Sequence, residues 1–286
     1  VGNPTNLGNS VGPIIKEPNE KLLRALTELE EGEEWLVKPK VLNNNNCWTP
    51  GIKINVQPNS WTHMNEWFGP VLGVMKAPNL KKAIEWQNAT EYGLTAGLHS
   101  LSTKECNYWL KNVEAGNLYI NRPITGAIVK RQPFGGWKKS SFGPTVKAGS
   151  SFYPSIFRRY VDVKDYDMLV KDLEELWTIK SKKIKNDNLQ SEHNYSVLYP
   201  HKKVLVVQDE SPDPEFKKYF DSVNKIFGTI IDKVEFSKLE DDDTLSDYSL
   251  IRWLSSESAP QWIYKYDFSI DTNHIMQNSE RELFSW

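Results

Sequence analysis

An alternation of two hydrophobic periods in the first 120 residues constrains the fold most strongly. Short apolar or β-branched runs, typical of strands, are separated by longer patterns whose apolar residues recur three and four positions apart, as on one face of a helix. The strand-like runs are residues 35–37, 52–56, 71–75, 94–99 and 117–120, and the helical patterns are residues 16–29, 80–90 and 103–113. Because parallel strands need a crossover connection, usually a helix, this order predicts an α/β layer with parallel strands.

A second, smaller α/β unit is predicted towards the end of the chain. Residues 203–207 form a buried-strand run, residues 214–227 are amphipathic, and residues 229–236 are again β-branched. This is the order of a βαβ unit, so we expect a Rossmann-like arrangement. A further helical pattern over residues 168–179, followed by a polar run, separates it from the first unit.

The distribution of charge supports two units joined by a linker. Residues 1–185 carry 25 basic and 18 acidic side chains, a net charge of +7, whereas residues 186–286 carry 10 and 19, a net charge of −9. We therefore expect a first domain over residues 1–160, a helical linker over residues 161–190 and a smaller α/β domain over residues 191–286.

The composition excludes several classes of protein. With 35 Lys and Arg residues against 37 Asp and Glu, the net charge of −2 gives no overall positive field for nucleic acid. No apolar stretch approaches the ~18 residues of a membrane span, and the five histidines and two cysteines show no metal-ligand spacing. So few cysteines indicate a reducing compartment, the cytoplasm. We expect no nucleic acid partner, no membrane insertion and no metal.

Four short motifs follow one another in the first half of the chain. In order they are Glu66-x-Phe68-Gly69-Pro70, Tyr92-Gly93-Leu94-Thr95-Ala96-Gly97, Ala115-Gly116-Asn117 and Arg131-Gln132-Pro133-Phe134-Gly135-Gly136. Their order and spacing resemble the C-terminal half of an aldehyde dehydrogenase catalytic domain. The run Thr125-Gly126-Ala127-Ile128-Val129 is similar, more specifically, to L-glutamate γ-semialdehyde dehydrogenase, also called 1-pyrroline-5-carboxylate dehydrogenase. The additional acidic unit resembles the C-terminal part of bifunctional proteins of the proline utilization A type.

The resemblance implies roles for five residues. The carboxylate of Glu66 would accept hydrogen bonds from both hydroxyls of an NAD ribose, and Phe68 would face the nicotinamide ring. The backbone N–H groups of Gly126 and Ala127 would bind the substrate carboxylate, and Phe134 would pack on the methylene chain between carboxylate and aldehyde. The implied substrate is the small molecule L-glutamate γ-semialdehyde, which such enzymes oxidise to L-glutamate in proline catabolism.

Each motif also has a purely structural interpretation. Taken alone, Glu66 is more often a solvated loop acid and Phe68 more often a core residue. A lone Pro-Phe-Gly-Gly more often marks a glycine-rich turn with a buried phenylalanine, here Phe134. The order of the four motifs favours the functional interpretation.

Neither cysteine is expected to be the nucleophile that aldehyde oxidation requires. Cys47 lies in a loop-like segment and Cys106 in a helical pattern, and neither has a neighbouring base or cation that would activate its thiol. In the family, the nucleophile, the general base and the dinucleotide-binding unit lie upstream of the region that matches Val1. We therefore expect a fragment that is inactive alone, from a parent that uses NAD, with FAD as a second cofactor where the parent includes a proline dehydrogenase domain.

Two other functions stay open at this point. One is a natural non-catalytic module whose acidic unit serves as a lid or an oligomerisation surface, and the other is an aldehyde dehydrogenase for a different aldehyde. Residues 151–163, apolar and aromatic with Pro154 among them, are similar to the intersubunit strand of such enzymes. We therefore expect the parent protein to be a homodimer or a higher homo-oligomer.

Overall fold

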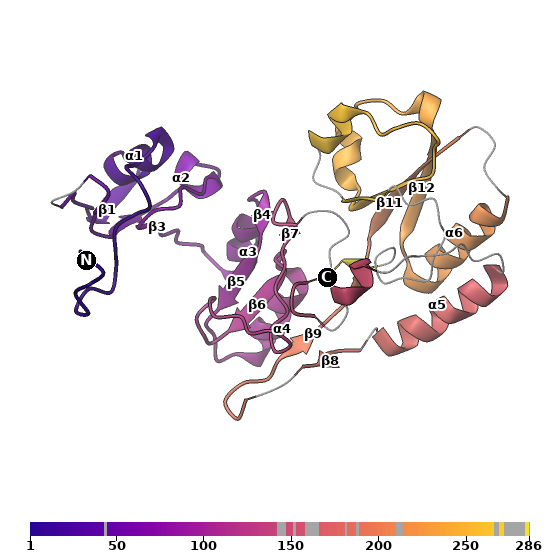
Figure 1. Ribbon diagram of the computed structural model, residues 1–286, viewed down its shortest axis with the longest axis horizontal. Coiled ribbons are helices and arrows are strands. Elements are labelled where there is room, and N and C mark those ends of the chain that lie inside the picture. Colours follow the sequence, from indigo (N-terminus) through magenta and orange to yellow (C-terminus); the bar gives the residue numbers. More distant parts are fainter. Residues whose placement is uncertain are drawn as a thin grey trace. The chain divides into compact units, whose positions relative to one another are not determined.

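The structure, a computed structural model, divides into two compact units (Figure 1). The first comprises Val1–Glu91 and Asn107–Val113, and the second comprises Tyr92–Cys106 and Glu114–Trp286. This division runs through the expected first domain of residues 1–160, so the expected domain boundaries stay a prediction. The described residues are 1–42, 45–141, 147–150, 153–157, 166–180, 182–186, 189–209, 214–265, 269–271 and 284–285.

The first unit contains a three-stranded sheet in the order β1-β2-β3, three complete helices and residues 107–112 of a fourth (Figure 1). The helices are α1 (Glu20–Thr27), α2 (Trp61–Met64) and α3 (Leu80–Asn88), and the strands are β1 (Glu34–Val37), β2 (Gly51–Ile54) and β3 (Val71–Gly73). Asn79 caps α3 as the sequence predicts, because its side-chain oxygen accepts a hydrogen bond of 2.9 Å from the N–H of Lys82. Asn19 caps α1 in the same way, through the N–H of Leu22.

Strands β2 and β3 are parallel, but β1 is antiparallel to β2, which corrects the prediction of parallel strands throughout. The connection between β1 and β2, residues 38–50, contains no helix among its described residues. Within it, Val41 pairs antiparallel with Trp48. Without a crossover helix the chain returns directly beside β1, and an antiparallel pair results.

The core of the first unit contains a buried ion pair. Lys53, in β2, and Glu33 have side chains that are 1% and 0% exposed, and the Nζ of Lys53 lies 3.4 Å from Oε2 of Glu33. The same ammonium lies 3.5 Å from Oγ1 of Thr62 and 5.2 Å from the centre of the Trp35 ring. Oε2 of Glu33 also accepts a hydrogen bond of 3.0 Å from the N–H of Glu30, so the pair links a loop to the sheet.

A βαβ element follows, whose strands belong to the second unit, whereas residues 107–112 of its helix are grouped with the first. Strand β5 (Thr95–Leu98) is followed by helix α4 (Thr103–Asn112) and by the parallel strand β6 (Asn117–Ile120), as the sequence predicts. The short strands β4 (Tyr92–Gly93) and β7 (Trp137–Lys138) form a separate antiparallel pair. The loop of residues 123–131 follows the carboxyl end of β6.

Residues 151–163, expected as an intersubunit strand, are described only at 153–157. There the chain forms the 3₁₀ helix η1 (Tyr153–Phe157), so an extended strand is wrong for these five residues. Pro154 explains the difference, because its fixed φ suits the first turn of a helix and it has no N–H to donate to a sheet. The remaining residues of the expected strand lie outside the described residues.

A parallel sheet in the order β12-β11-β13-β14 forms the predicted second α/β unit (Figure 1). Its strands are β11 (Lys203–Gln208), β12 (Ile230–Glu235), β13 (Leu250–Trp253) and β14 (Ser269–Asp271), and helices α5 (Tyr166–Lys180) and α6 (Pro214–Phe227) belong to it. Helix α6 has the bounds that the sequence predicts. The smaller elements are β8 (Ile184–Lys185), β9 (Tyr195–Ser196), β10 (Tyr199–Pro200), β15 (Phe284–Ser285), η2 (Phe236–Lys238), η3 (Asp243–Asp247) and η4 (Gln261–Lys265).

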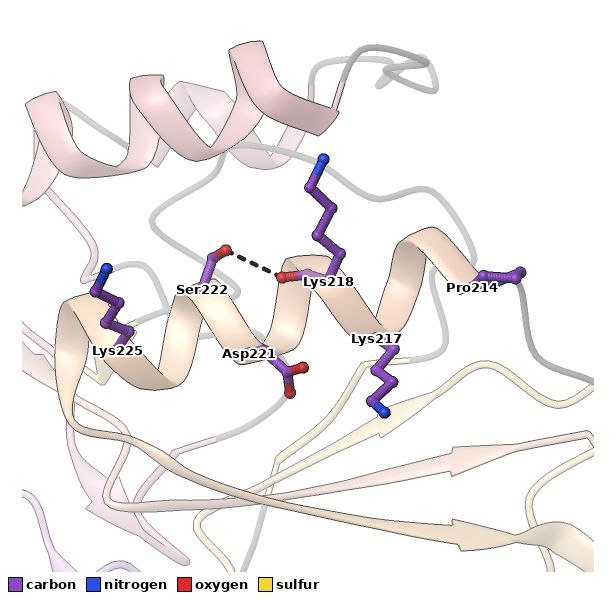
Figure 2. A pocket seen from close by; sticks show the side chains of 6 residues that line it. All are labelled: Pro214, Lys217, Lys218, Asp221, Ser222 and Lys225. Atoms are coloured by element: carbon purple, nitrogen blue, oxygen red, sulfur yellow. Dashed lines mark hydrogen bonds between the residues drawn. The ribbon is translucent and has the colours of Figure 1, made fainter.

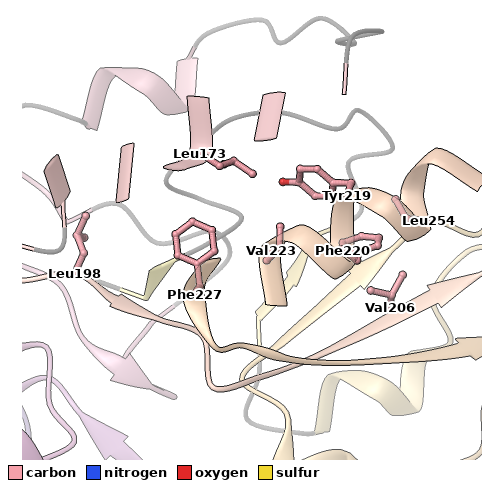
Figure 3. Close-up of a cluster of buried hydrophobic side chains, with 8 residues drawn as sticks. All are labelled: Leu173, Leu198, Val206, Tyr219, Phe220, Val223, Phe227 and Leu254. Atoms are coloured by element: carbon pink, nitrogen blue, oxygen red, sulfur yellow. The ribbon is translucent and has the colours of Figure 1, made fainter. Parts of the chain in front are cut away.

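Two apolar clusters cover the faces of this sheet. Val206 of β11 points to the cluster beneath α5 and α6, whereas its neighbours Leu205 and Val207 point to the opposite face, as the two-residue period of a strand requires. The first cluster contains Leu173, Leu198, Val206, Tyr219, Phe220, Val223, Phe227 and Leu254 (Figure 3). A strand that is buried on both faces reads as a continuous apolar run, which is why the sequence revealed β11.

Candidate functional site

Glu66 and Phe68 lie in the loop that connects α2 to β3 in the first unit. Both side chains are exposed, and the Phe68 ring is 84% exposed. Between them, the ring of Trp67 stacks on the ring of Trp61 with a centroid distance of 5.7 Å, and its Nε1 donates to the carbonyl of Val71 at 3.3 Å. Trp67 therefore fastens the loop, while its two neighbours along the chain stay exposed.

The backbone of Phe68 has a φ of +51°, in the left-handed region that a bulky residue rarely adopts. Such a conformation costs of order 1–3 kcal/mol and tends to persist at ligand-binding sites. The interpretation of Phe68 as a core residue is wrong, because its ring is largely exposed. An acceptor carboxylate at Glu66 and an open aromatic ring two residues later are groups that fit a ribose and a planar heterocycle.

Gly126 and Ala127 lie in the second unit, in the loop that follows β6. We call residues 123–131 the anchor loop. Gly126 is exposed with a φ of +82°, and no heavy atom lies within 4 Å of the position that a Cβ would take. Within the part of the chain that the structure describes, neither the N–H of Gly126 nor that of Ala127 donates a hydrogen bond. The loop thus presents two successive backbone donors in a conformation that only glycine adopts easily.

Side chains at the two ends of the anchor loop fix its backbone. At the start, Nη2 of Arg122 donates to the carbonyl of Thr125 at 3.3 Å. At the end, Oε1 of the buried Gln132 accepts a hydrogen bond of 2.9 Å from the N–H of Ile128. These two contacts lie immediately before Gly126 and immediately after Ala127, and they leave the N–H groups of those two residues available.

Phe134, the third predicted substrate residue, lies on the other side of Gln132. Its backbone pairs with Ala148 through two hydrogen bonds of 2.9 Å, and its side chain is 37% exposed rather than buried in a turn. The carbonyl of Gly149, one residue after Ala148, accepts a hydrogen bond of 3.0 Å from the N–H of Lys130 in the anchor loop. Residues 147–150 therefore contact both the anchor loop and Phe134, and they tie the predicted substrate residues together.

The buried side chain of Asn117 holds the backbone on both sides of Phe134. Its Nδ2 donates to the carbonyl of Pro133 at 2.9 Å, and its Oδ1 accepts from the N–H of Gly135 at 3.1 Å. The Nζ of Lys147 lies 3.3 Å from the same Oδ1 and also donates to the carbonyl of Gly116. Asn117 belongs to a motif noted in the sequence, but no pattern there indicated Lys147 as its partner.

Burial lowers the pKa of Lys147 from 10.5 to about 8. Between these two values the unfolded chain holds more protons than the folded chain, so stability rises as the pH increases through this window. We expect a contribution on the order of 3 kcal/mol between pH 7.5 and 10.5. The measurement is urea unfolding, followed by tryptophan fluorescence, of the native chain and of Lys147→Met across this range. The difference between the two free energies of unfolding should change with pH, and parallel curves would contradict the assignment.

Neither cysteine has the surroundings of an activated nucleophile. Cys47 is buried, and the thiol of the half-buried Cys106 lies 3.7 Å from the carbonyl of Ser100. Among the described residues there is no cluster of three or more metal-binding side chains and no helix long and apolar enough to cross a membrane.

A hollow of about 400 Å³ lies along α6, away in sequence from all predicted site residues. Its lining residues all come from this helix, and their side chains spread outward from it in different directions (Figure 2). The dashed line there is a bond of 3.0 Å from Oγ of Ser222 to the carbonyl of Lys218. The lining residues are Pro214, Lys217, Lys218, Asp221, Ser222 and Lys225. Because the polar side chains that line this open groove do not point toward a common position where a ligand could bind, we do not consider it the candidate site.

Comparisons with known proteins give a consistent set of relatives. Residues 1–164 match the model of the aldehyde dehydrogenase family. The chain is 35% identical to 1-pyrroline-5-carboxylate dehydrogenase 1 of Halalkalibacterium halodurans and 34% identical to 1-pyrroline-5-carboxylate dehydrogenase of Bacillus subtilis, each over 155 residues. These residues are 54% of this chain and 30% of each relative, so the chain spans about a third of the length of the curated relatives it matches.

A solved structure of proline utilization A from Corynebacterium freiburgense resembles nearly the whole chain. The match covers 94% of this chain and 30% of that chain, with 38% sequence identity and a TM-score of 0.79. The resemblance therefore extends beyond residue 164 into the acidic α/β unit.

Proposed function

Because the chain belongs to the aldehyde dehydrogenase family, we propose that it is the substrate-recognition part of an NAD-dependent L-glutamate γ-semialdehyde dehydrogenase, which oxidises its substrate to L-glutamate. The names of its relatives support this choice of substrate, since two of them are 1-pyrroline-5-carboxylate dehydrogenases. We assign no catalytic residue to this chain, because Cys47 is buried and the hydrogen-bond partner of the Cys106 thiol among the described residues is a backbone carbonyl.

One observation carries the proposal: the anchor loop offers the consecutive N–H groups of Gly126 and Ala127 with no other acceptor among the described residues. A carboxylate has two oxygens and accepts hydrogen bonds only, so it matches two neighbouring backbone donors. The left-handed backbone of Gly126 is typical of the concave arrangements of N–H groups that bind anions. An aldehyde without a carboxylate leaves these donors unused.

Phe134 supplies the second part of substrate recognition. Its partly exposed side chain offers an apolar surface for the methylene groups that separate the carboxylate of the semialdehyde from its aldehyde. Because residues 147–150 contact both the anchor loop and the backbone of Phe134, the spacing between anchor and apolar surface is fixed. Such fixed spacing favours one chain length of substrate, since the aldehyde carbon must reach a defined position.

Glu66 and Phe68 are the residues that would hold NAD. The carboxylate of Glu66 accepts hydrogen bonds from ribose hydroxyls, and the open ring of Phe68 covers a face of the nicotinamide. NAD, when bound, accepts the hydride that the aldehyde carbon loses on oxidation. The stacked Trp61 and Trp67 keep the loop of Glu66 and Phe68 in place.

The parent protein is proposed to be of the proline utilization A type, because the structural match to such a protein covers 94% of the chain. In this proposal residues 1–160 belong to the dehydrogenase domain, residues 161–190 are a linker and residues 191–286 are part of a C-terminal domain. The parent then carries FAD in a proline dehydrogenase domain and assembles as a homodimer or a higher homo-oligomer.

The test uses the protein at its full natural length, with NAD reduction followed by absorbance. We expect turnover of L-glutamate γ-semialdehyde and a much higher KM for an uncarboxylated aldehyde such as butanal. In Ala127→Leu, bulk at the anchor should weaken a hydrogen bond to a charged group, which raises the KM for the semialdehyde about ten- to a hundredfold. The KM for butanal should stay the same.

Val129→Leu is the matched control, because it adds bulk to an exposed position of the same loop without touching the two free donors. Its kinetic constants should equal those of the native protein. An unchanged semialdehyde KM in Ala127→Leu would show that the carboxylate binds elsewhere, and absence of NAD reduction in the native full-length protein would remove the proposed function altogether.

A further inference from the structure

One carboxylate, far away in the sequence, contacts both residues that fix the anchor loop. Glu192 lies at a tight turn in the hairpin that β8 and β9 form, where Leu189 and Glu192 pair as an isolated bridge. Its Oε2 accepts from Nη1 of Arg122 at 2.5 Å, and its Oε1 accepts from Nε2 of Gln132 at 3.0 Å. Glu192 is separated from these two partners by 70 and 60 positions.

Each partner of Glu192 reaches on to the backbone of the anchor loop. Arg122 donates to the carbonyl of Thr125, and Gln132 accepts from the N–H of Ile128. The two chains of contacts therefore start at one carboxylate and end on either side of Gly126 and Ala127. Gln132 is further oriented by Oδ1 of Asn194, which accepts from its Nε2 at 2.9 Å and lies on the same hairpin.

The burial of this network makes it an effective support. Gln132 is buried, and the side chains of Arg122 and Glu192 are only 28% and 21% exposed. Hydrogen bonds to charged groups are shorter and stronger than those between neutral groups, and solvent competes with them less when they are shielded. Without Glu192, Arg122 loses its ion pair and Gln132 loses one of the two acceptors of its Nε2, so we expect both contacts to the loop backbone to weaken together.

We propose that Glu192 is a positioning residue for substrate recognition, which holds the anchor loop through Arg122 and Gln132 so that the N–H groups of Gly126 and Ala127 bind the substrate carboxylate. The inference rests on the proposed function of the anchor loop. It gives the hairpin, which lies outside the residues that match the family model, a role in choosing the substrate.

If Glu192 acts through its negative charge, its removal should change the KM for the semialdehyde in the opposite direction from that expected if it positions the anchor loop. Glu192 carries a negative charge on the network that supports the anchor loop, so its removal would, by electrostatics alone, favour an anionic substrate and lower the KM. If Glu192 acts by positioning, its removal raises the KM for the anionic substrate in spite of the lost negative charge. The sign of the change therefore separates the two effects.

The experiment measures the kinetics of Glu192→Ala in the full-length protein with L-glutamate γ-semialdehyde and with butanal. We expect the KM for the semialdehyde to rise about tenfold, with kcat changed less than about twofold and with no change in the KM for butanal. Isothermal titration with L-glutamate, which has the same carboxylate, should show a similar loss of affinity without any catalytic step. A merely structural role would affect both aldehydes alike.

Glu235→Ala is the matched control, because Glu235 forms a surface ion pair of 2.6 Å with Lys238 in the same unit. It should leave both KM values unchanged. Glu192→Gln keeps one acceptor oxygen and the size of the side chain, so it should fold even if Glu192→Ala does not, and it should show a smaller rise in the same direction.

The experiment distinguishes failure of the positioning role of Glu192 from failure of the proposed function. A native protein that prefers the semialdehyde over butanal, together with Glu192 variants whose preference is equal or greater, overturns the positioning role and leaves the proposed function intact. A native protein with no preference for the carboxylated aldehyde overturns both.

Discussion

Lys53→Met is expected to lower the free energy of unfolding of the first unit by about 3–5 kcal/mol. The substitution leaves the carboxylate of Glu33 without its cation in a site where its side chain is 0% exposed. An unpaired charge in such a place is strongly destabilising, because neither water nor a counter-ion compensates for its lost hydration. Urea unfolding, followed by tryptophan fluorescence to which Trp35, Trp61 and Trp67 of this unit contribute, measures the change.

Two further variants define the cause. Glu33→Gln together with Lys53→Met removes both charges and keeps an oxygen that accepts from the N–H of Glu30, so most of the lost stability should return. Lys82→Met breaks an ion pair that is shorter, 2.8 Å to Glu85, but whose side chains are 46% and 55% exposed. It should cost less than about 1 kcal/mol. Equal losses in Lys53→Met and Lys82→Met would show that burial of the first pair has no energetic weight.

Gly116→Ala is expected to destabilise the second unit by about 3 kcal/mol and to raise the KM for the semialdehyde. A Cβ at this position would collide with the carbonyl oxygen of Gly135 and would lie 2.8 Å from its carbonyl carbon. Both are backbone atoms, and the hydrogen bond from the N–H of Gly135 to Oδ1 of Asn117 holds this backbone in place. The clash therefore cannot be relieved by rotating a flexible side chain. The strain must displace the segment that carries Phe134. Urea unfolding and steady-state kinetics of the full-length protein give the two readouts.

Gly228→Ala is the control for the loss of a glycine as such. Gly228 has a φ of +69° just after α6, and nothing lies within 4 Å of a Cβ there. The alanine should therefore cost only about 1 kcal/mol of backbone strain and should leave the KM unchanged. If the two alanine variants lose equal stability, steric contact with Gly135 is not the cause.

The sequence predicted best those elements whose signals are local. Helix α6 has the predicted bounds because its apolar residues recur at helical spacing, and β11 was evident as an uninterrupted apolar run. The sequence of strand β13 does not predict a strand, because Arg252 interrupts its apolar pattern, although Arg252 is only 2% exposed in the structure. Strand β14 is three residues long and includes Ser269 and Asp271, so its sequence carries no strand signal.

In the candidate site, too, residues in local sequence motifs were predicted, and residues that act through long-range contacts were not. Glu66, Phe68, Gly126, Ala127 and Phe134 were identified because they belong to short motifs that resemble a known family. Of the supporting residues, Gln132 belongs to one of these motifs and Arg122 immediately precedes the anchor loop, but nothing in the sequence assigns a role to either. Glu192 had no detectable signal, since its contacts are with residues 60 and 70 positions away and periodicity reports only on neighbours along the chain.

The bridge from Glu192 to Arg122 and Gln132 has an evolutionary consequence. If Glu192 holds the anchor loop as proposed, three positions in distant parts of the gene act on one loop, and a substitution at any one of them is expected to change the effect of substitutions at the other two on substrate binding. Loss of the acid alone leaves the partly shielded guanidinium of Arg122 without this ion pair, so under the proposal a descendant with a different preferred aldehyde is expected to differ in both the hairpin and the anchor loop. Under the proposal, the segment beyond the family match is then inherited together with the substrate preference.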